Sequence, residues 1–270
     1  MKIVLAPDSF KGTLSSMEII NILEKAAQNC FDSVEIVKVP IADGGEGTVD
    51  ALITATSGKY RQVEVMGPLS TQKVTAKYGI INGKTAVIEM AEASGITLVE
   101  EGHKNPLLTT TYGTGQMIKA ALDEGIRDFV IGIGGSATND GGIGACQALG
   151  VQFLDKEGKE VGFGGQELSR IDNIIIESMD NRIRESRVTV ICDVNNPLVG
   201  PEGATAVYGP QKGVTEDNFH TLESGMENYQ SLIKRITGMD MAKIPGSGAA
   251  GGLGAALVTF FGATLKPGID

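Results

Sequence analysis

The apolar residues of this chain fall into short runs that alternate with polar, glycine-containing loops. The run at residues 2–6 predicts a buried strand, and the run at 34–39 predicts a second one. Between them, Ser15 followed three residues later by Glu18 predicts a capping box, after which apolar residues recur at helical spacing. This pattern predicts a βαβ unit, in which the loops after both strands lie at one edge of the sheet.

Between residues 61 and 96 the pattern changes to alternation of apolar and polar residues. Three such segments, separated by Gly-Pro and Asn-Gly turns, predict an antiparallel or mixed sheet. For Glu89 and Glu92, at the end of the third segment, alternation favours a solvent-facing position over a position in a ligand crevice. Apolar runs at 129–133 and 187–192 predict two more buried strands, so the expected fold class is α/β.

The two loops of the N-terminal unit carry residues suited to ligand binding. The first contains Asp8, Ser9 and Lys11. The second contains carboxylates and glycines in close succession: Asp43, Gly44, Gly45 and Glu46. Carboxylates in such a loop can bind Mg²⁺ or orient a hydroxyl. The alternative is structural, with Asp43 forming a turn and Glu46 capping the following helix.

A glycine-rich connection from strand to helix follows residues 129–133. Such a loop brings backbone N–H groups and a helix start close to an anion, so it predicts a phosphate site, with close packing of helix on sheet as the alternative. It matches neither GxGxxG nor the P-loop pattern. Its candidate ligand residues are Gly134, Gly135, Ser136, Thr138, Asn139 and Asp140. Asn139 and Asp140 also suit a plain turn.

Three further candidates occur later in the chain. Asp193 follows the predicted strand at 187–192, where a carboxylate is placed either for catalysis or metal binding or for a turn, and Asn196 is close by. Lys212 lies in a segment rich in glycine and proline, where it can contact phosphate or be an ordinary surface charge. The glycine-rich segment 246–254 predicts another loop at the same crevice.

Composition excludes several other classes of function. A net charge of −10 without a basic run argues against a nucleic-acid surface, and it means that any anion site needs a local cation. Three distant cysteines and two histidines predict neither a disulfide framework nor a zinc site, and they fit a reducing cytosol. The most apolar stretch, 252–263, is too short to span a bilayer. We therefore expect a cytoplasmic protein without nucleic-acid or membrane partners.

The loops together resemble those of the bacterial type I glycerate kinase family. The matching motifs are APDSFKGTLSS (6–16), VPIADGGEGT (39–48), IGGSATNDGG (133–142), CDVNNPLVGP (192–201), YGPQKG (208–213) and GSGAAGGLG (246–254). The resemblance covers the chain from end to end. It implies ATP- and Mg²⁺-dependent phosphorylation of D-glycerate, with 2-phosphoglycerate favoured over 3-phosphoglycerate as the product.

The resemblance also implies two α/β domains. Residues 1–62 would form the first half of a flavodoxin-like domain, a Rossmann-like three-layer fold, and residues 63–270 a second α/β domain with a mixed sheet. Family members continue well beyond the length of this chain, so the second half of the flavodoxin-like domain is expected to be absent. A homodimer is a further expectation.

For the chemistry, we expect Gly134, Gly135 and Ser136 to cradle ATP phosphates and Lys11 to neutralise a phosphate or the glycerate carboxylate. Asp43 and Asp193 are candidates both for orienting the attacking hydroxyl and for binding Mg²⁺, and the sequence leaves these roles open. Two other hypotheses remain: a non-catalytic protein that binds a small molecule or nucleotide, and a kinase for another small hydroxy acid.

Overall fold

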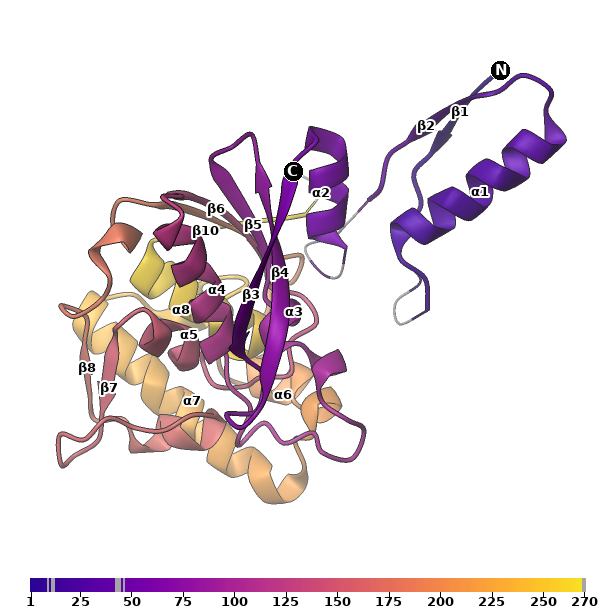
Figure 1. The fold of residues 1–270 in the computed structure, drawn as a ribbon. Coiled ribbons are helices and arrows are strands. Elements are labelled where there is room, and N and C mark those ends of the chain that lie inside the picture. The colour runs from indigo at the N-terminus through magenta and orange to yellow at the C-terminus, as the bar shows by residue number, and fades with distance from the viewer. Residues whose placement is uncertain (9, 11–12, 42–44, 46, 269–270) are drawn as a thin grey trace.

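The computed structural model describes residues 1–8, 10, 13–41, 45 and 47–268. At the N-terminus, β1 (Lys2–Leu5), α1 (Ser16–Cys30) and β2 (Glu35–Lys38) form a βαβ unit that stands apart from the remaining elements (Figure 1). The two strands pair in parallel. The predicted capping box is present, because the Glu18 amide donates to Ser15 Oγ and the Ser15 amide donates to Glu18 Oε2.

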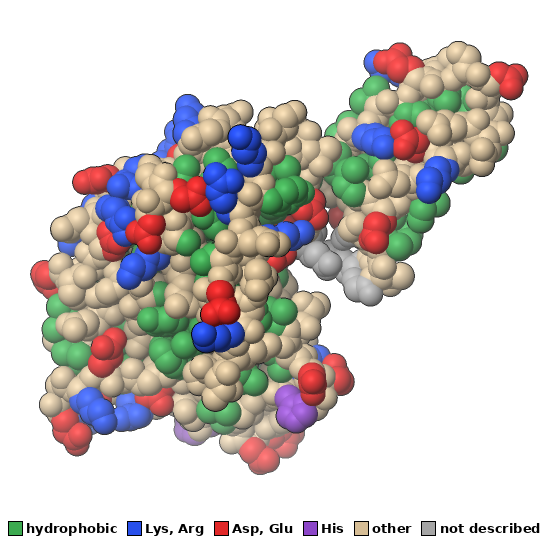
Figure 2. Space-filling view, viewed as in Figure 1, with side chains coloured by type: hydrophobic (Ala, Val, Ile, Leu, Met, Phe, Trp, Pro, Cys, Tyr) green, Lys and Arg blue, Asp and Glu red, His purple; other side chains and the backbone are tan. Residues whose placement is uncertain are grey.

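The N-terminal unit is more exposed than its apolar sequence predicts. Val4 on β1 is 57% exposed, and Phe10, Ile22 and Phe31 also face solvent. Figure 2 shows apolar side chains on the surface of this unit. Parallel strands are ordinarily covered on both faces, whereas these two strands form a separate sheet with one helix. The prediction of a strand at residues 2–6 is confirmed, and the prediction that it is buried is wrong for Val4.

The larger part of the chain is built on a six-stranded mixed sheet with the order β10-β9-β6-β5-β4-β3. Its strands are β3 (Lys59–Met66), β4 (Lys73–Ile81), β5 (Thr85–Glu89), β6 (Asp128–Gly132), β9 (Arg187–Ile191) and β10 (Thr264–Lys266). The first four strands in this order, from β10 to β5, are parallel to one another, and β4 and β3 are antiparallel to their neighbours. The expected α/β class with a mixed sheet is confirmed.

Helices cover both faces of this sheet. On one face, α2 (Thr48–Thr56) buries Val49 and Ile53 against Ile81 and Val87. On the other face, α4 (Tyr112–Asp123), α5 (Ile143–Ala148) and α8 (Leu253–Phe261) belong to the main hydrophobic core. Because β5 lies between β4 and β6 and is covered on both sides, all five of its residues are buried.

The remaining elements extend the main core away from the sheet. A small antiparallel pair, β7 (Gln152–Leu154) and β8 (Asn173–Ile175), lies beside the long helix α7 (Glu216–Thr237) in Figure 1. The Phe153 ring of β7 packs edge-on against Tyr229 of α7 and Phe260 of α8. Two short helices, α3 (Ala91–Ser94) and α6 (Ala204–Tyr208), flank the loops at the carboxyl edge of the sheet.

No helix among the described residues is both long enough and apolar enough to cross a membrane. The division into residues 1–62 and 63–270 and the flavodoxin-like assignment of the first part stay predictions, and residue 62 lies within β3.

Candidate active site

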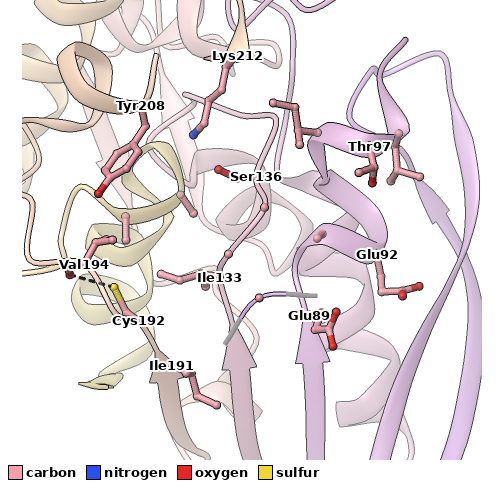
Figure 3. A pocket seen from close by; sticks show the side chains of 18 of the residues that line it. Glu89, Glu92, Thr97, Ile133, Ser136, Ile191, Cys192, Val194, Tyr208 and Lys212 are labelled. Carbon is pink, nitrogen blue, oxygen red and sulfur yellow. Dashed lines mark hydrogen bonds between the residues drawn. The ribbon is translucent and has the colours of Figure 1, made fainter. Parts of the chain in front are cut away.

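A cavity of about 650 Å³ lies at the carboxyl edge of the six-stranded sheet. Its wall includes residues at the ends of three adjacent parallel strands: Glu89 as the last residue of β5, residues 133–136 after β6, and residues 191–194 at and after the end of β9. Figure 3 shows Tyr208 and Lys212 on one side of this space and Glu89 and Glu92 on the other. The loops after β5, β6 and β9 therefore meet at one site, and of the described residues in the two N-terminal loops only Gly45 lines it.

The structure brings together part of the residue set predicted from the sequence. The predicted residues that line the cavity are Gly45, Gly134, Gly135, Ser136, Asp193 and Lys212. Thr138, Asn139 and Asp140 are fully buried and are not among the lining residues, and neither are Asp8 and Asn196. Ser9, Lys11, Asp43, Gly44 and Glu46 lie outside the described residues. The functional roles of all these residues stay predictions.

The loop after β6 is held in place by the segment after α3. Gly135 adopts a φ of +73°, which favours glycine, and its carbonyl accepts a hydrogen bond from the Ile96 amide at 2.8 Å. The Ala137 amide donates to the Ser94 carbonyl at 2.9 Å. Ser136 lies between these two bonds, with its side chain at the cavity wall (Figure 3). Two backbone hydrogen bonds, on either side of Ser136, thus hold this loop against the segment 94–96.

Lys212 is the only Lys or Arg among the described residues that line the cavity. It comes from the 3₁₀ turn Pro210–Lys212, is 2% exposed, and its Nζ donates to the Thr138 carbonyl at 2.8 Å. Burial lowers the pKa of its ammonium group to about 7, an effect that the nearby Asp140 carboxylate opposes. In its protonated form Lys212 places a positive charge at the cavity wall, and an anion bound there would favour that form.

Asp140 does not line the cavity, and its carboxylate joins the segment before α4 to the turn before α5 by hydrogen bonds. Its Oδ2 accepts hydrogen bonds from the Thr111 amide at 2.8 Å and from Thr111 Oγ1 at 2.9 Å. Its Oδ1 accepts one from the Gly142 amide at 3.0 Å. Burial raises the pKa of this carboxyl group, and these donors oppose that rise. The side chain therefore serves as an internal acceptor that fixes the turn into α5.

Glu89 and Glu92, for which alternation favoured a solvent-facing position, both line the cavity, and Glu89 is the one that is buried. Alternation favoured a solvent-facing side chain, but Glu89 is 5% exposed and lies at the cavity wall. Its Oε1 accepts a hydrogen bond from the Val49 amide in the first turn of α2 at 2.7 Å. The sequence signal that could have located it is the uninterrupted apolar run at residues 86–88 directly before it, which suits a strand buried on both faces.

The β9 end of the cavity combines a carboxylate, a thiol and a phenol. The exposed Asp193 accepts a hydrogen bond from the Gly268 amide through Oδ1 at 2.6 Å. Tyr208, which lines the cavity, donates a hydrogen bond to Asn196 Oδ1 at 2.6 Å, so Asn196 contacts the cavity wall through the tyrosine. Burial raises the pKa of the Cys192 thiol, which donates to the Val194 carbonyl.

No group of three Asp, Glu, His or Cys side chains in the described part of the chain is arranged to hold a metal ion.

The glycine-rich segment before α8 forms another part of the cavity wall and is hydrogen-bonded to the loop after β6. Ala249 and Ala250 line the cavity, and the Gly251 carbonyl accepts a hydrogen bond from the Gly141 amide at 2.9 Å. Both Ala250 (φ +53°) and Gly251 (φ +64°) adopt left-handed backbone conformations. A Cβ on Gly251 would overlap the Thr138 carbonyl, whose oxygen is also the acceptor for Lys212.

Replacing Gly251 with alanine is expected to lower the free energy of unfolding by about 2 kcal/mol or more, because it combines a left-handed alanine with an overlap against backbone. The measurement is the urea midpoint by circular dichroism. Ala250→Gly is the matched control: it removes the left-handed penalty at the adjacent residue and should raise stability by up to about 1 kcal/mol. A Gly251→Ala variant as stable as wild type would contradict this packing.

Comparison with known proteins identifies the family. The model of the glycerate kinase family matches residues 3–270. This chain belongs to the glycerate kinase family. It is 49% identical to the glycerate 2-kinase of Escherichia coli K12 and 49% identical to the glycerate kinase of Bacillus subtilis 168, in each case over 100% of this chain and 71% of the relative.

A solved structure agrees with this assignment. The crystal structure described as a putative glycerate kinase 2 from Salmonella typhimurium LT2 superposes with a TM-score of 0.90 at 46% identity, covering 100% of this chain and 72% of that chain. The chain thus spans about seven-tenths of the length of these glycerate kinases. The family predicted from the six loop motifs is confirmed.

Proposed function

We propose that this chain is an ATP-dependent glycerate kinase that transfers the terminal phosphoryl group of ATP to a hydroxyl of D-glycerate, with 2-phosphoglycerate as the favoured product. The observation that carries this proposal is the cavity itself. In a chain of the glycerate kinase family, it combines a fixed glycine-serine loop with a buried lysine at the carboxyl ends of parallel strands. Its volume of about 650 Å³ is ample for a nucleotide phosphate chain beside a three-carbon acid.

Phosphoryl transfer depends on positioning and charge neutralisation more than on covalent chemistry. In our proposal, the Gly134–Gly135 backbone and the Ser136 hydroxyl donate hydrogen bonds to ATP phosphates, and Lys212 stabilises the negative charge that spreads over the transferred group. Lys11 and Asp43, expected from the sequence to act as cation and as metal or hydroxyl ligand, stay predictions because they lie outside the described residues.

Magnesium enters this proposal as part of the Mg-ATP substrate. The described donors do not form a closed metal cage, and Asp193 is an exposed carboxylate at the cavity wall. Such a donor set fits Mg²⁺, which ordinarily keeps waters and nucleotide phosphates as ligands and takes one or two protein carboxylates. When bound, the ion neutralises phosphate charge. A cytoplasmic location and a homodimer stay predictions.

The test is incubation of this chain with Mg-ATP and D-glycerate, followed by phosphorus NMR of the products. The expected result is a phosphomonoester signal at 2-phosphoglycerate with equimolar ADP. Nucleotide or glycerate binding without ADP formation would favour the non-catalytic binding protein. Turnover of other small hydroxy acids in preference to glycerate would favour a kinase of different specificity.

A further inference from the structure

Glu89 occupies a special position in the cavity wall. It is the last residue of β5, and its backbone pairs with Gly132 of β6 directly before the glycine-serine loop. Its side chain points to the face of the sheet that α2 covers, as does Val87 two residues earlier. Figure 3 shows its carboxylate at the cavity, across from Lys212.

The carboxylate of Glu89 caps a helix that has no cap of its own. Gly47 occupies the N-cap position of α2 and provides no side-chain hydrogen bond. Glu89 Oε1 accepts a hydrogen bond from the Val49 amide at 2.7 Å, and the Gly47 backbone is close enough to lower the pKa of this carboxyl group. A glutamine could accept the same amides without the cost of burying a charge. A glutamate differs from a glutamine in that it can take up and release a proton, so this ability is what the carboxylate adds at this position.

The surroundings of Glu89 bring its pKa close to neutral, where it can exchange a proton. Burial raises the pKa of its carboxyl group to about 7, the carboxylates of Glu92 on α3 and Asp50 on α2 raise it further, and the α2 amides oppose the rise. Among the described residues, Lys77 on β4, which is paired with Asp50, and Tyr60 on β3 also interact with it electrostatically. A carboxylate that titrates near neutral pH is suited to exchange protons with a substrate.

We propose that Glu89 is the general base that accepts the proton of the attacking glycerate hydroxyl. This inference rests on the proposed kinase function. In the step, the O–H bond of the substrate breaks and its proton passes to the free lone pair of the Glu89 carboxylate. The hydroxyl oxygen forms a bond to the γ-phosphorus while the bond from phosphorus to the β–γ bridging oxygen breaks, and ADP leaves with that electron pair. Glu89 afterwards releases the proton to solvent.

The test is Glu89→Gln in this chain, because glutamine keeps an acceptor for the α2 amides and cannot take up the proton. We expect kcat to fall at least about tenfold, with the KM for ATP close to wild type and the acid limb of the kcat/KM profile near pH 7 lost. The folded-state pKa lies above the unfolded value of 4.5, so ionisation of Glu89 lowers stability as pH rises through about 7. The glutamine variant should therefore melt no lower than wild type in alkaline buffer.

Glu92→Gln is the matched control, since Glu92 also lines the cavity and its charge raises the pKa of Glu89. This variant should retain the acid limb but shift it to lower pH. Wild-type kcat and an unchanged acid limb in Glu89→Gln would overturn the proposal. If Glu89→Gln fails to fold, the Glu92→Gln profile decides, because an unmoved limb would equally overturn it. A wild-type chain that makes no phosphoglycerate would instead contradict the kinase function itself.

Discussion

Replacing Lys212 with methionine is expected to lower kcat/KM for glycerate phosphorylation by about 100- to 1,000-fold, the usual cost of removing one preorganised charge-stabilising donor. Methionine has a similar length and apolar stem, so it fills the same buried space without the ammonium group. Lys212 is 2% exposed and lines the cavity. Its Nζ donates one hydrogen bond to the Thr138 carbonyl, and an ammonium group has two further N–H donors. The measurement is steady-state kinetics with varied ATP and glycerate.

Lys243→Met is the control for this prediction, because Lys243 is a lysine whose side chain is 82% exposed and lies outside the cavity wall. It should leave kcat/KM near the wild-type value. Wild-type kinetics in Lys212→Met would remove Lys212 from the phosphate site and leave the anion without a described cation.

The same substitution should change how stability depends on pH. The pKa of Lys212 is 10.5 in an unfolded chain and about 7 in the folded protein, so between these values the unfolded chain binds the extra proton. The stability of the wild type therefore rises with pH across this window, and the methionine variant lacks that contribution. The Tm of Lys212→Met relative to wild type should be highest at or below about pH 7 and decline as the pH approaches 10.5.

Replacing Asp140 with alanine is expected to lower the free energy of unfolding by about 3 kcal/mol or more, because it leaves buried donors without an acceptor. The donors are the Thr111 amide, Thr111 Oγ1 and the Gly142 amide. The measurement is the urea midpoint by circular dichroism. Asp140→Asn keeps one acceptor oxygen and should lose less stability than the alanine variant.

Asp32→Ala removes an exposed carboxylate in the N-terminal unit and should change the midpoint little. An Asp140→Ala variant with wild-type stability and impaired nucleotide binding would contradict the structural role and return Asp140 to the set of ligand residues. The two roles that the sequence left open, turn former and ligand, are thereby separated by experiment.

The positions of the strands and loops could be predicted from the sequence because buried parallel strands appear as short apolar runs. Residues 129–133 and 187–192 are such runs, and they correspond to the adjacent strands β6 and β9. Since carboxyl ends of parallel strands meet at one edge, the approach of Ser136 and Asp193 to one cavity follows from their positions after β6 and β9. Lys212 does not follow a strand, and the sequence left open whether it contacts phosphate or is a surface charge.

The contacts that the sequence could not predict join residues that are distant in the chain. Asp140 was recognisable as a turn residue, but its second partner, Thr111, precedes it by 29 residues. Glu89 was misplaced because alternation predicts a sheet with one wet face, whereas α2 and the main core cover both faces of β5. The exposure of Val4 could not be predicted, because the apolar sequence of β1 indicates a strand but not whether other elements pack against it.

In the proposed function, phosphoryl transfer takes place in the cavity at the carboxyl edge of β5, β6 and β9. The most direct measurement is a crystal structure of this chain with a non-hydrolysable Mg-ATP analogue and D-glycerate. We predict phosphate density against Ser136 and the Lys212 ammonium, with a glycerate hydroxyl facing Glu89. A nucleotide bound elsewhere on the chain, with this cavity occupied only by water, would contradict the account.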